Sequence, residues 1–253
     1  MQKQYGLIGY PLSHSFSKKY FTEKFEKEGI KDCGYELFPL ASIDQLPQLL
    51  KDHPLLGGLN VTIPYKESVI PFLDELDETA KAVGAVNCIE ISRSDDHKVK
   101  LIGYNTDVFG FRQSIKPFLE TQHERALILG TGGAAKAVHS VLKEIGITCY
   151  FATRGKSDKE GNNIFTYEEL NENMIRAFKL IVNATPVGTF PDTDASPQIP
   201  YEYISRGHLL YDLVYNPAET VFLKKGKEKG AAAVNGLSML HQQAEEAWQI
   251  WNR

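Results

Sequence analysis

The sequence has few cysteines, no excess of positive charge and no long hydrophobic run. Its 253 residues include three cysteines, Cys33, Cys88 and Cys149, which stand far apart. An odd and widely spaced set is typical of reduced thiols, so we expect a cytoplasmic protein without disulfides. The 28 lysines and arginines are outnumbered by 32 aspartates and glutamates, which gives a net charge of −4. This balance lacks the basic footprint of a nucleic-acid-binding protein, and we expect no such partner.

Metal and membrane signals are missing as well. No two cysteines have the spacing of metal ligands, and the seven histidines form no zinc-type pattern, so we predict no bound metal. No apolar run approaches the roughly 18 residues that a membrane helix needs. The first ten residues lack the apolar core of a signal peptide. We therefore expect no membrane partner.

Short apolar segments rich in β-branched residues alternate with amphipathic segments of helical length. The pattern predicts strands over residues 5–9, 35–38, 58–62, 86–91, 126–129, 148–152, 180–183, 209–212 and 231–234. It predicts helices over residues 17–28, 46–50, 74–83, 106–118, 132–144, 167–174, 220–229 and 236–251, with a capping box at Ser42 and Gln45. Alternation of this kind needs parallel crossovers, which makes the fold class α/β.

We expect two α/β domains that flank a cleft. The boundary is placed where a strand ends near residues 102–104, so the first domain spans residues 1–103 and the second residues 104–235. The final helix, residues 236–253, is expected to return to the first domain and complete it.

The strongest local signal is a glycine-rich turn between an apolar strand and a helix. Residues 126–129 run directly into Gly130-Thr131-Gly132-Gly133-Ala134-Ala135, which has the form Gly-x-Gly-x-x-Ala. The first glycine permits a tight turn, the second lets the backbone approach a pyrophosphate, and the small third residue allows close helix–strand packing. The helix N-terminus then faces the phosphates. A dinucleotide-binding Rossmann domain is predicted; the alternative is a glycine-rich turn packed for structural reasons.

The residues at the end of the next strand indicate which dinucleotide binds. NAD sites usually place an acid about 20 residues after the first glycine, on the ribose 2′-hydroxyl. Here the strand ends in Thr153 and Arg154, with Lys156 just beyond, and carries no acid. A guanidinium holds a 2′-phosphate by two parallel hydrogen bonds, so the sequence predicts NADP over NAD. The alternative is a solvated basic turn.

Polar residues of the first domain gather where strands are expected to end, in residues 9–17, 60–66, 84–87 and 103–107. Ligands of open α/β sheets lie beyond the carboxyl ends of strands. Hydroxyls, amides, one amine and one carboxylate suit a small polyhydroxylated acid. Each has a structural alternative: Ser17 as a helix cap, Asp107 at a helix dipole, Asn60 and Asn87 as turn formers, Lys66 as a surface lysine, His14 as a loop-ordering group.

Taken together, these motifs resemble the shikimate dehydrogenase family over nearly the whole chain. The matching segments are Ser15-Phe-Ser17, Asn60-Val-Thr-Ile-Pro-Tyr-Lys66, Gly84-Ala-Val-Asn87, Asn105-Thr-Asp107, Gly130-Thr-Gly-Gly-Ala134, Asn183-Ala-Thr-Pro-Val-Gly188, Tyr211-Asp-Leu-Val-Tyr-Asn-Pro217 and Asn235-Gly-Leu-Ser-Met-Leu240 with Gln243. The motif from Asn60 to Lys66 is highly specific. The cofactor-selecting turn, often Asn-Arg-Thr in this family, reads Thr153-Arg154-Gly155 here.

The resemblance implies NADPH-dependent, reversible reduction of 3-dehydroshikimate to shikimate, with Lys66 and Asp107 as the catalytic pair. It implies substrate contacts from Ser15, Ser17, Asn60, Thr62, Asn87, Asp107, Tyr215 and Gln243. It implies dinucleotide contacts from Gly130, Thr131, Gly132, Gly133, Ala134, Thr153, Arg154, Lys156, Leu213 and Gly236, with Met239 near the nicotinamide. Whether Lys66 transfers the proton or only stabilises charge stays open, and so does the choice between a monomer and a homodimer.

Two other functions fit parts of the pattern. One is an enzyme of the same family that acts on quinate or prefers NAD. The other is a non-catalytic ligand-sensing module on the same fold, because a fold does not fix a function. The joint presence of Lys66, Asp107 and the glycine-rich turn favours the enzyme.

Overall fold

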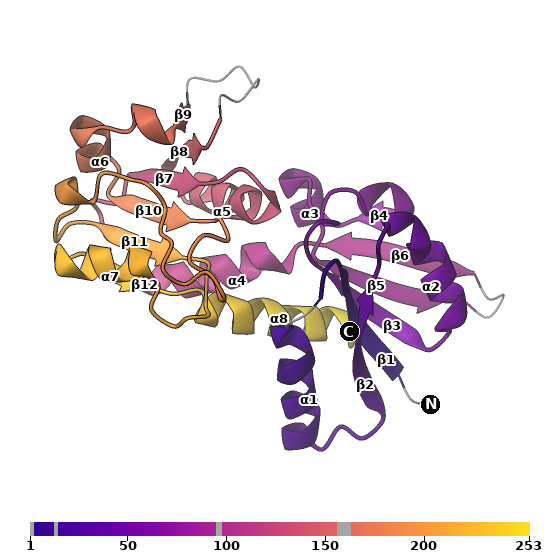
Figure 1. The fold of residues 1–253 in the computed structure, drawn as a ribbon. Coiled ribbons are helices and arrows are strands. Elements are labelled where there is room, and N and C mark those ends of the chain that lie inside the picture. The colour runs from indigo at the N-terminus through magenta and orange to yellow at the C-terminus, as the bar shows by residue number, and fades with distance from the viewer. Residues whose placement is uncertain (1–2, 13–14, 95–97, 156–162) are drawn as a thin grey trace. The chain divides into compact units, whose positions relative to one another are not determined.

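A computed structural model describes the chain except for residues 1–2, 13–14, 95–97 and 156–162 (Figure 1). His14 and Lys156, both singled out in the sequence, therefore lie outside the described residues. The chain forms two compact units. The first consists of Met1–Thr106 and Ala244–Arg253, and the second of Asp107–Gln243. The last helix, α8 (Leu237–Trp251), contributes residues to both units.

The first unit contains a mixed six-stranded sheet in the order β2-β1-β3-β5-β6-β4. The strands are β1 (Lys3–Gly9), β2 (Cys33–Pro39), β3 (Leu56–Val61), β4 (Glu75–Leu76), β5 (Cys88–Arg93) and β6 (Val99–Tyr104). β1 pairs in parallel with β2 and β3, whereas β5 runs antiparallel to both β3 and β6. Strand β4 is missing from the sequence prediction, and of β6 only the end, near residues 102–104, was expected. The close succession of β5 and β6 gives an antiparallel pair, for which no crossover helix is needed.

Both faces of this sheet are buried. Helices α1 (Phe16–Glu28) and α8 contribute to an aromatic cluster with residues of β1 and β2, and the cluster includes Tyr5, Phe21, Tyr35 and Trp251. Helices α2 (Leu46–Asp52) and α3 (Glu78–Val83) contribute to a second, aliphatic cluster. The helix predicted over residues 74–83 is wrong in its first turn: residues 75–76 form β4, and helix α3 starts after Asp77, whose carboxylate accepts a hydrogen bond from the Ala80 N–H at 2.7 Å.

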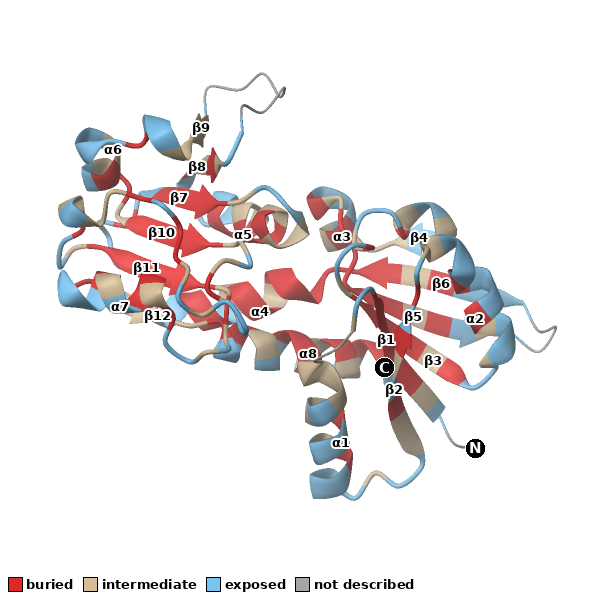
Figure 2. Ribbon diagram, in the orientation of Figure 1, coloured by how far each residue is buried: buried red, intermediate tan, exposed pale blue. Residues whose placement is uncertain are grey.

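The second unit contains a parallel six-stranded sheet in the order β12-β11-β10-β7-β8-β9. The strands are β7 (Arg125–Leu129), β8 (Thr148–Thr153), β9 (Ile164–Thr166), β10 (Leu180–Asn183), β11 (Leu209–Asp212) and β12 (Ala232–Val234). Figure 2 shows β7, β10 and β11 buried along most of their length. The order reverses between β7 and β10, as in the doubly wound dinucleotide-binding sheet, and so creates a topological switch point. The predicted Rossmann topology is confirmed.

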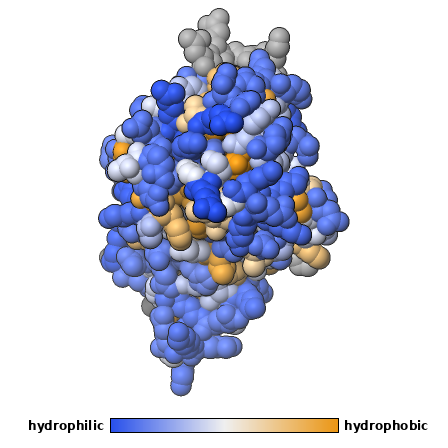
Figure 3. All heavy atoms as spheres, turned by 90° about the vertical axis from the view of Figure 1, so that its left-hand side faces the viewer, coloured by the Kyte–Doolittle hydropathy of each residue, from blue (hydrophilic) through white to orange (hydrophobic). Residues whose placement is uncertain are grey.

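Helices connect these strands. They are α4 (Thr106–Ile115), which starts at the last residue of the first unit, α5 (Gly133–Glu144), α6 (Glu172–Ala177) and α7 (Val221–Glu228). Short 3₁₀ turns lie at Ile43–Gln45, Ile70–Phe72, Lys116–Phe118, Tyr167–Glu169 and Tyr201–Tyr203, and the predicted capping box of Ser42 and Gln45 opens the first of them. Among the described residues, none of the helices has the length and apolarity to cross a membrane. The face drawn in Figure 3 is mainly hydrophilic, with small separate hydrophobic areas.

Candidate active site

The first polar cluster sits at the start of α1. Ser15 is the N-cap of this helix, and its hydroxyl accepts a hydrogen bond from the Lys18 N–H at 3.4 Å. The alternative in which Ser17 caps the helix is therefore wrong. Ser17 lies in the first turn, where its side chain interacts with the hydroxyl of Tyr35. Both serines of the motif thus stand where α1 begins, beyond the carboxyl end of β1.

The second cluster is held against the end of β1. The Thr62 N–H donates to the Ile8 carbonyl at 2.9 Å, and the Tyr10 N–H donates to the Ile63 carbonyl at 3.1 Å. Asn60 lies within β3 and is 5% exposed, so it is not a turn former. Its side-chain oxygen accepts a hydrogen bond from the Tyr35 hydroxyl at 2.7 Å.

Lys66 lies in a turn that follows β3 and is partly exposed. Its backbone carbonyl accepts a hydrogen bond from the Val86 N–H at 2.7 Å, which ties the turn to the segment Gly84–Asn87. The Tyr65 hydroxyl donates to the Leu40 carbonyl and anchors the turn from the other side. The turn that carries the lysine is therefore held at the Lys66 carbonyl and at the side chain of Tyr65.

The polar clusters at residues 84–87 and 103–107 form one hydrogen-bonded network. The side-chain oxygen of Asn87 accepts from the Thr106 N–H at 2.7 Å, and its amide donates to the Thr106 hydroxyl at 3.0 Å. Asn105 donates from its amide to the Ala85 carbonyl at 2.8 Å. Asn87 thus satisfies an N–H of the first turn of α4, as an N-cap does. The next residue, Asp107, is 7% exposed and opens the second unit.

The glycine-rich turn lies at the switch point of the second sheet. Gly130 has a φ of +100°, and a Cβ atom there would lie 3.0 Å from the Thr185 methyl group, beyond the end of β10. Helix α5 then begins after Gly132, which has no side chain to cap it. Thr131 and Gly132 are exposed, whereas Ala135 is buried against the sheet as predicted. The N–H groups of this helix start are available to an anion.

The end of β8 carries the residues expected to recognise a 2′-phosphate. The Thr153 hydroxyl donates a hydrogen bond to the Gly155 carbonyl, which folds the chain back after the strand. Arg154 is exposed, and its charge acts on Tyr167, whose pKa is raised by burial and lowered by the arginine. A cation therefore stands at this strand end, within the second unit.

The remaining predicted residues of the second unit lie in the segment that follows β11 and at the start of α8. A Cβ atom on Gly236 would lie 2.2 Å from the Leu213 carbonyl oxygen, so a larger residue could not occupy this position without moving the backbone. Tyr215 is half-buried, and burial raises the pKa of its hydroxyl. Met239 and Gln243, both on α8, are buried, and α4 packs against them at Gly110.

No role was predicted for two residues of the described chain that carry polar chemistry. Tyr35 contacts Asn60, and Asp212 lies fully buried at the end of β11. The second was visible in the pattern as an acid that ends an apolar strand. The first carried no signal, because a tyrosine within an amphipathic strand is ordinary core material.

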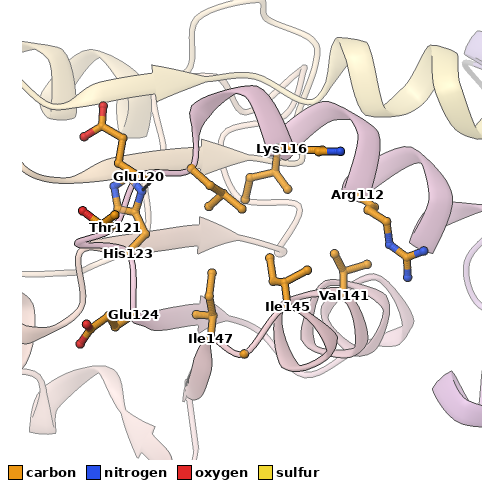
Figure 4. A pocket seen from close by; sticks show the side chains of 12 residues that line it. Arg112, Lys116, Glu120, Thr121, His123, Glu124, Val141, Ile145 and Ile147 are labelled. Atoms are coloured by element: carbon orange, nitrogen blue, oxygen red, sulfur yellow. Dashed lines mark hydrogen bonds between the residues drawn. The ribbon is translucent and has the colours of Figure 1, made fainter.

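A cavity of about 460 Å³ lies elsewhere in the second unit (Figure 4). It is bounded by the ends of α4 and α5 and by the segment that leads into β7, with Arg112, His123, Val141 and Ile145 among its lining residues. This is the amino end of β7, opposite to the glycine-rich turn. None of the residues predicted for the active site lines the cavity.

Comparisons with known proteins agree with the motifs. A family model described as the shikimate dehydrogenase substrate binding domain matches residues 7–89. The chain is similar to a Clostridium beijerinckii protein named shikimate dehydrogenase (NADP(+)), with 39% identity over 98% of this chain and 91% of the relative. It is similar in structure to a chorismate mutase/shikimate 5-dehydrogenase fusion protein from Clostridium acetobutylicum, with a TM-score of 0.85, 36% identity and coverage of 100% and 92%. A Thermus thermophilus shikimate 5-dehydrogenase, solved with NADP(H) and shikimate, matches with a TM-score of 0.82 and 31% identity over 98% of this chain and 93% of that one.

Proposed function

Because this chain belongs to the shikimate dehydrogenase family, we propose that it catalyses the reversible, NADPH-dependent reduction of 3-dehydroshikimate to shikimate in the shikimate pathway. The observation that carries the proposal is near full-length similarity to relatives of that name, such as the 39% identity over 98% of the chain. The motif from Asn60 to Lys66 is intact, and the second sheet has the topology of a dinucleotide-binding domain.

The second unit supplies a fitting site for the dinucleotide. The helix start at Gly132 has no side-chain cap, and the turn before it is exposed, so a pyrophosphate can approach its N–H groups. The contacts that we assign come from Gly130, Thr131, Gly132, Gly133, Ala134, Thr153, Arg154, Leu213, Gly236 and Met239, with Lys156 beyond the described residues. Bound NADPH supplies the hydride. Arg154, at a strand end without an acid, supports NADP over NAD.

For the substrate, we assign contacts to Ser15, Ser17, Asn60, Thr62, Asn87, Asp107, Tyr215 and Gln243. Hydroxyl and amide groups donate to and accept from ring hydroxyls, and the serine hydroxyls donate to a carboxylate. The positions of Asn60 and Asn87 support this assignment, because each amide is held by hydrogen bonds on strands or at strand ends.

The reacting oxygen is assigned to Lys66 and Asp107. The Lys66 ammonium donates a hydrogen bond to the carbonyl oxygen, which becomes an alkoxide as the hydride arrives and must take up a proton. Asp107 orients the ammonium and accepts a hydrogen bond from the adjacent substrate hydroxyl. The fixed backbone of the Lys66 turn supports this role, since an oriented donor needs no reorganisation during the reaction.

We further infer that the protein works in the cytoplasm as a monomer or homodimer, without nucleic-acid or membrane partners. All three cysteines are free thiols, and Cys88 and Cys149 are buried. Free thiols are the usual state in a reducing compartment.

The test is a spectrophotometric assay of 3-dehydroshikimate reduction with NADPH and NADH in parallel. We expect turnover with NADPH and a higher kcat/KM for NADPH than for NADH. Oxidation of quinate and shikimate in the reverse direction, with each cofactor, distinguishes the related quinate enzyme. If neither cofactor is oxidised while shikimate still shifts the thermal unfolding midpoint, the ligand-sensing alternative is correct instead.

A further inference from the structure

Tyr35 lies on β2 of the first unit, and its hydroxyl reaches a residue of the proposed substrate site. The sheet order places β1 between β2 and β3, so the tyrosine side chain spans β1 to contact Asn60 on β3. We propose that Tyr35 is a positioning residue: its hydroxyl holds the Asn60 amide in the one orientation that presents an N–H to the substrate, and so sets substrate affinity. This inference rests on the function proposed above.

Two neighbours determine which way the Asn60 amide points. The Tyr35 hydroxyl donates to Oδ1 at 2.7 Å, and Nδ2 donates to the backbone carbonyl of Asn87 at 3.3 Å. In the flipped amide, Oδ1 would face the Asn87 carbonyl oxygen and Nδ2 would face the tyrosine. Two acceptors would then meet, and the buried amide would lose a hydrogen bond.

The tyrosine itself is held rigidly. It is 4% exposed, and its ring stacks on Phe21 with centroids 4.6 Å apart and an interplanar angle of 14°. Trp251 packs against the ring from α8 at a centroid distance of 6.5 Å. A ring fixed on two sides keeps its hydroxyl in one place, which is what a group that orients another residue requires.

The hydroxyl also keeps its proton. Burial raises the pKa of Tyr35 well above its ordinary value, against a smaller opposite effect of the Ser17 side chain. The phenol therefore remains a donor throughout the pH range in which an enzyme works. Oδ1 of Asn60 is its acceptor at every such pH.

The fixed Asn60 amide has one N–H donor left for the substrate. An asparagine amide has two N–H donors, and one of the Asn60 pair is used on the Asn87 carbonyl. Within the described part of the chain, the other N–H has no protein partner. We assign this donor to a substrate oxygen. Ser17, another proposed substrate contact, interacts with the same tyrosine hydroxyl.

The test compares Tyr35→Phe with the matched control Tyr5→Phe. Both substitutions keep the ring and remove one hydroxyl from the same aromatic cluster, but the Tyr5 hydroxyl contacts Asn252 and not Asn60. For Tyr35→Phe we expect KM for shikimate to rise about tenfold while kcat changes by less than about threefold, because a contact made equally in ground and transition states affects KM. KM for NADP⁺ should stay unchanged. Tyr5→Phe should keep the wild-type KM for shikimate.

A double-mutant cycle with Asn60→Ala identifies the route of the effect. If Tyr35 acts through Asn60, adding Tyr35→Phe to Asn60→Ala will not raise KM for shikimate further; a general structural effect would multiply the two increases. All constants are measured well below the lowest unfolding midpoint. Wild-type turnover with an unchanged KM in Tyr35→Phe, or equal changes in both phenylalanine variants, would overturn this inference alone. A wild-type protein without shikimate turnover would overturn the proposed function and this inference together.

Discussion

Asn183 donates a hydrogen bond from its side-chain amide to the Asp212 carboxylate over 2.9 Å and so links the ends of β10 and β11. The same carboxylate accepts from the Val214 N–H at 3.0 Å and from the Thr220 hydroxyl at 2.6 Å. Asp212 is fully buried, and burial raises its pKa from 3.8 to about 6 despite these three donors. The end of β11 is therefore held by an acid that is costly to ionise.

This raised pKa predicts how stability depends on pH. Between about pH 4 and pH 6 the unfolded chain releases the Asp212 proton while the folded protein keeps it, so the group's contribution to stability falls as pH rises. The full loss is about 3 kcal/mol, since each pKa unit corresponds to about 1.4 kcal/mol. Asp212→Asn has no proton to release. We expect the stability of Asp212→Asn relative to wild type to improve by about that amount between pH 4 and pH 7.

Urea unfolding of both proteins at a series of pH values measures this difference. Below pH 3.8 the Asp212 side chain is mostly protonated in the folded and the unfolded protein, so measurements there give the cost of the amide substitution itself. A difference in the free energy of unfolding that is the same at pH 4 and pH 7 would contradict the prediction.

Lys66→Ala should lower kcat by about 100-fold or more, because it removes the donor to the oxygen on which charge develops. Binding of NADPH, measured by fluorescence titration, should be unchanged. The control is Lys81→Ala on α3, which removes an exposed lysine paired with Glu78 and should leave kcat at the wild-type value. Near-normal turnover by Lys66→Ala would remove this lysine from the mechanism.

Arg154→Gln should change the choice of cofactor. We expect KM for NADPH to rise about tenfold or more, since a charged hydrogen bond to the 2′-phosphate is lost, and KM for NADH to stay the same. Initial rates at varied cofactor concentration measure both constants. Arg176→Gln on α6 removes an exposed arginine of the same unit, paired with Glu172, and should alter neither. An equal rise in KM for NADPH and for NADH would show that Arg154 does not bind the 2′-phosphate.

Trp251→Ala should lower the free energy of unfolding by about 3 to 5 kcal/mol, the range for removal of a large buried side chain. The indole stacks on Tyr5 with centroids 4.8 Å apart and donates to the Ile89 carbonyl at 3.0 Å. Gly58 leaves the space for it, because a Cβ there would lie 2.2 Å from the indole nitrogen. Urea unfolding measures the loss, with the exposed Gln249→Ala on the same helix as control. A loss as small as that of the control would contradict this packing.

The second sheet was predictable because its strands are buried on both faces. Strands β10 and β11 have the predicted bounds, since continuous apolar runs that end in Asn183 and Asp212 leave little ambiguity. Strand β4, at an edge, was predicted as helix. Its two residues, Glu75 and Leu76, have no local β preference, and they are held by pairing with Ile102 and Gly103 in β6. Such pairing depends on tertiary context, which local patterns do not carry.

The residues of the candidate site, too, could be predicted from the sequence only in part. The turn at Gly130 could be singled out because strand, turn and helix follow each other directly along the chain, whereas Asn87 directly precedes β5. Asn60 could be singled out by its motif, but its partner Tyr35 stands 25 residues earlier on another strand. A contact set by sheet order rather than by spacing leaves no mark in a single sequence.

The last residues of helix α8 belong to the first unit. In the sequence, the whole second unit, Asp107–Gln243, separates these residues from the rest of the first unit. During vectorial synthesis, Tyr5 and Phe21 emerge from the ribosome long before Trp251 is made. Strands β7 to β11 of the second unit can therefore emerge while the first unit still lacks Trp251 and exposes aromatic side chains. The part of the protein that is translated first is thus the last to complete its core, and a nascent chain stalled near its end would present those aromatic side chains to chaperones.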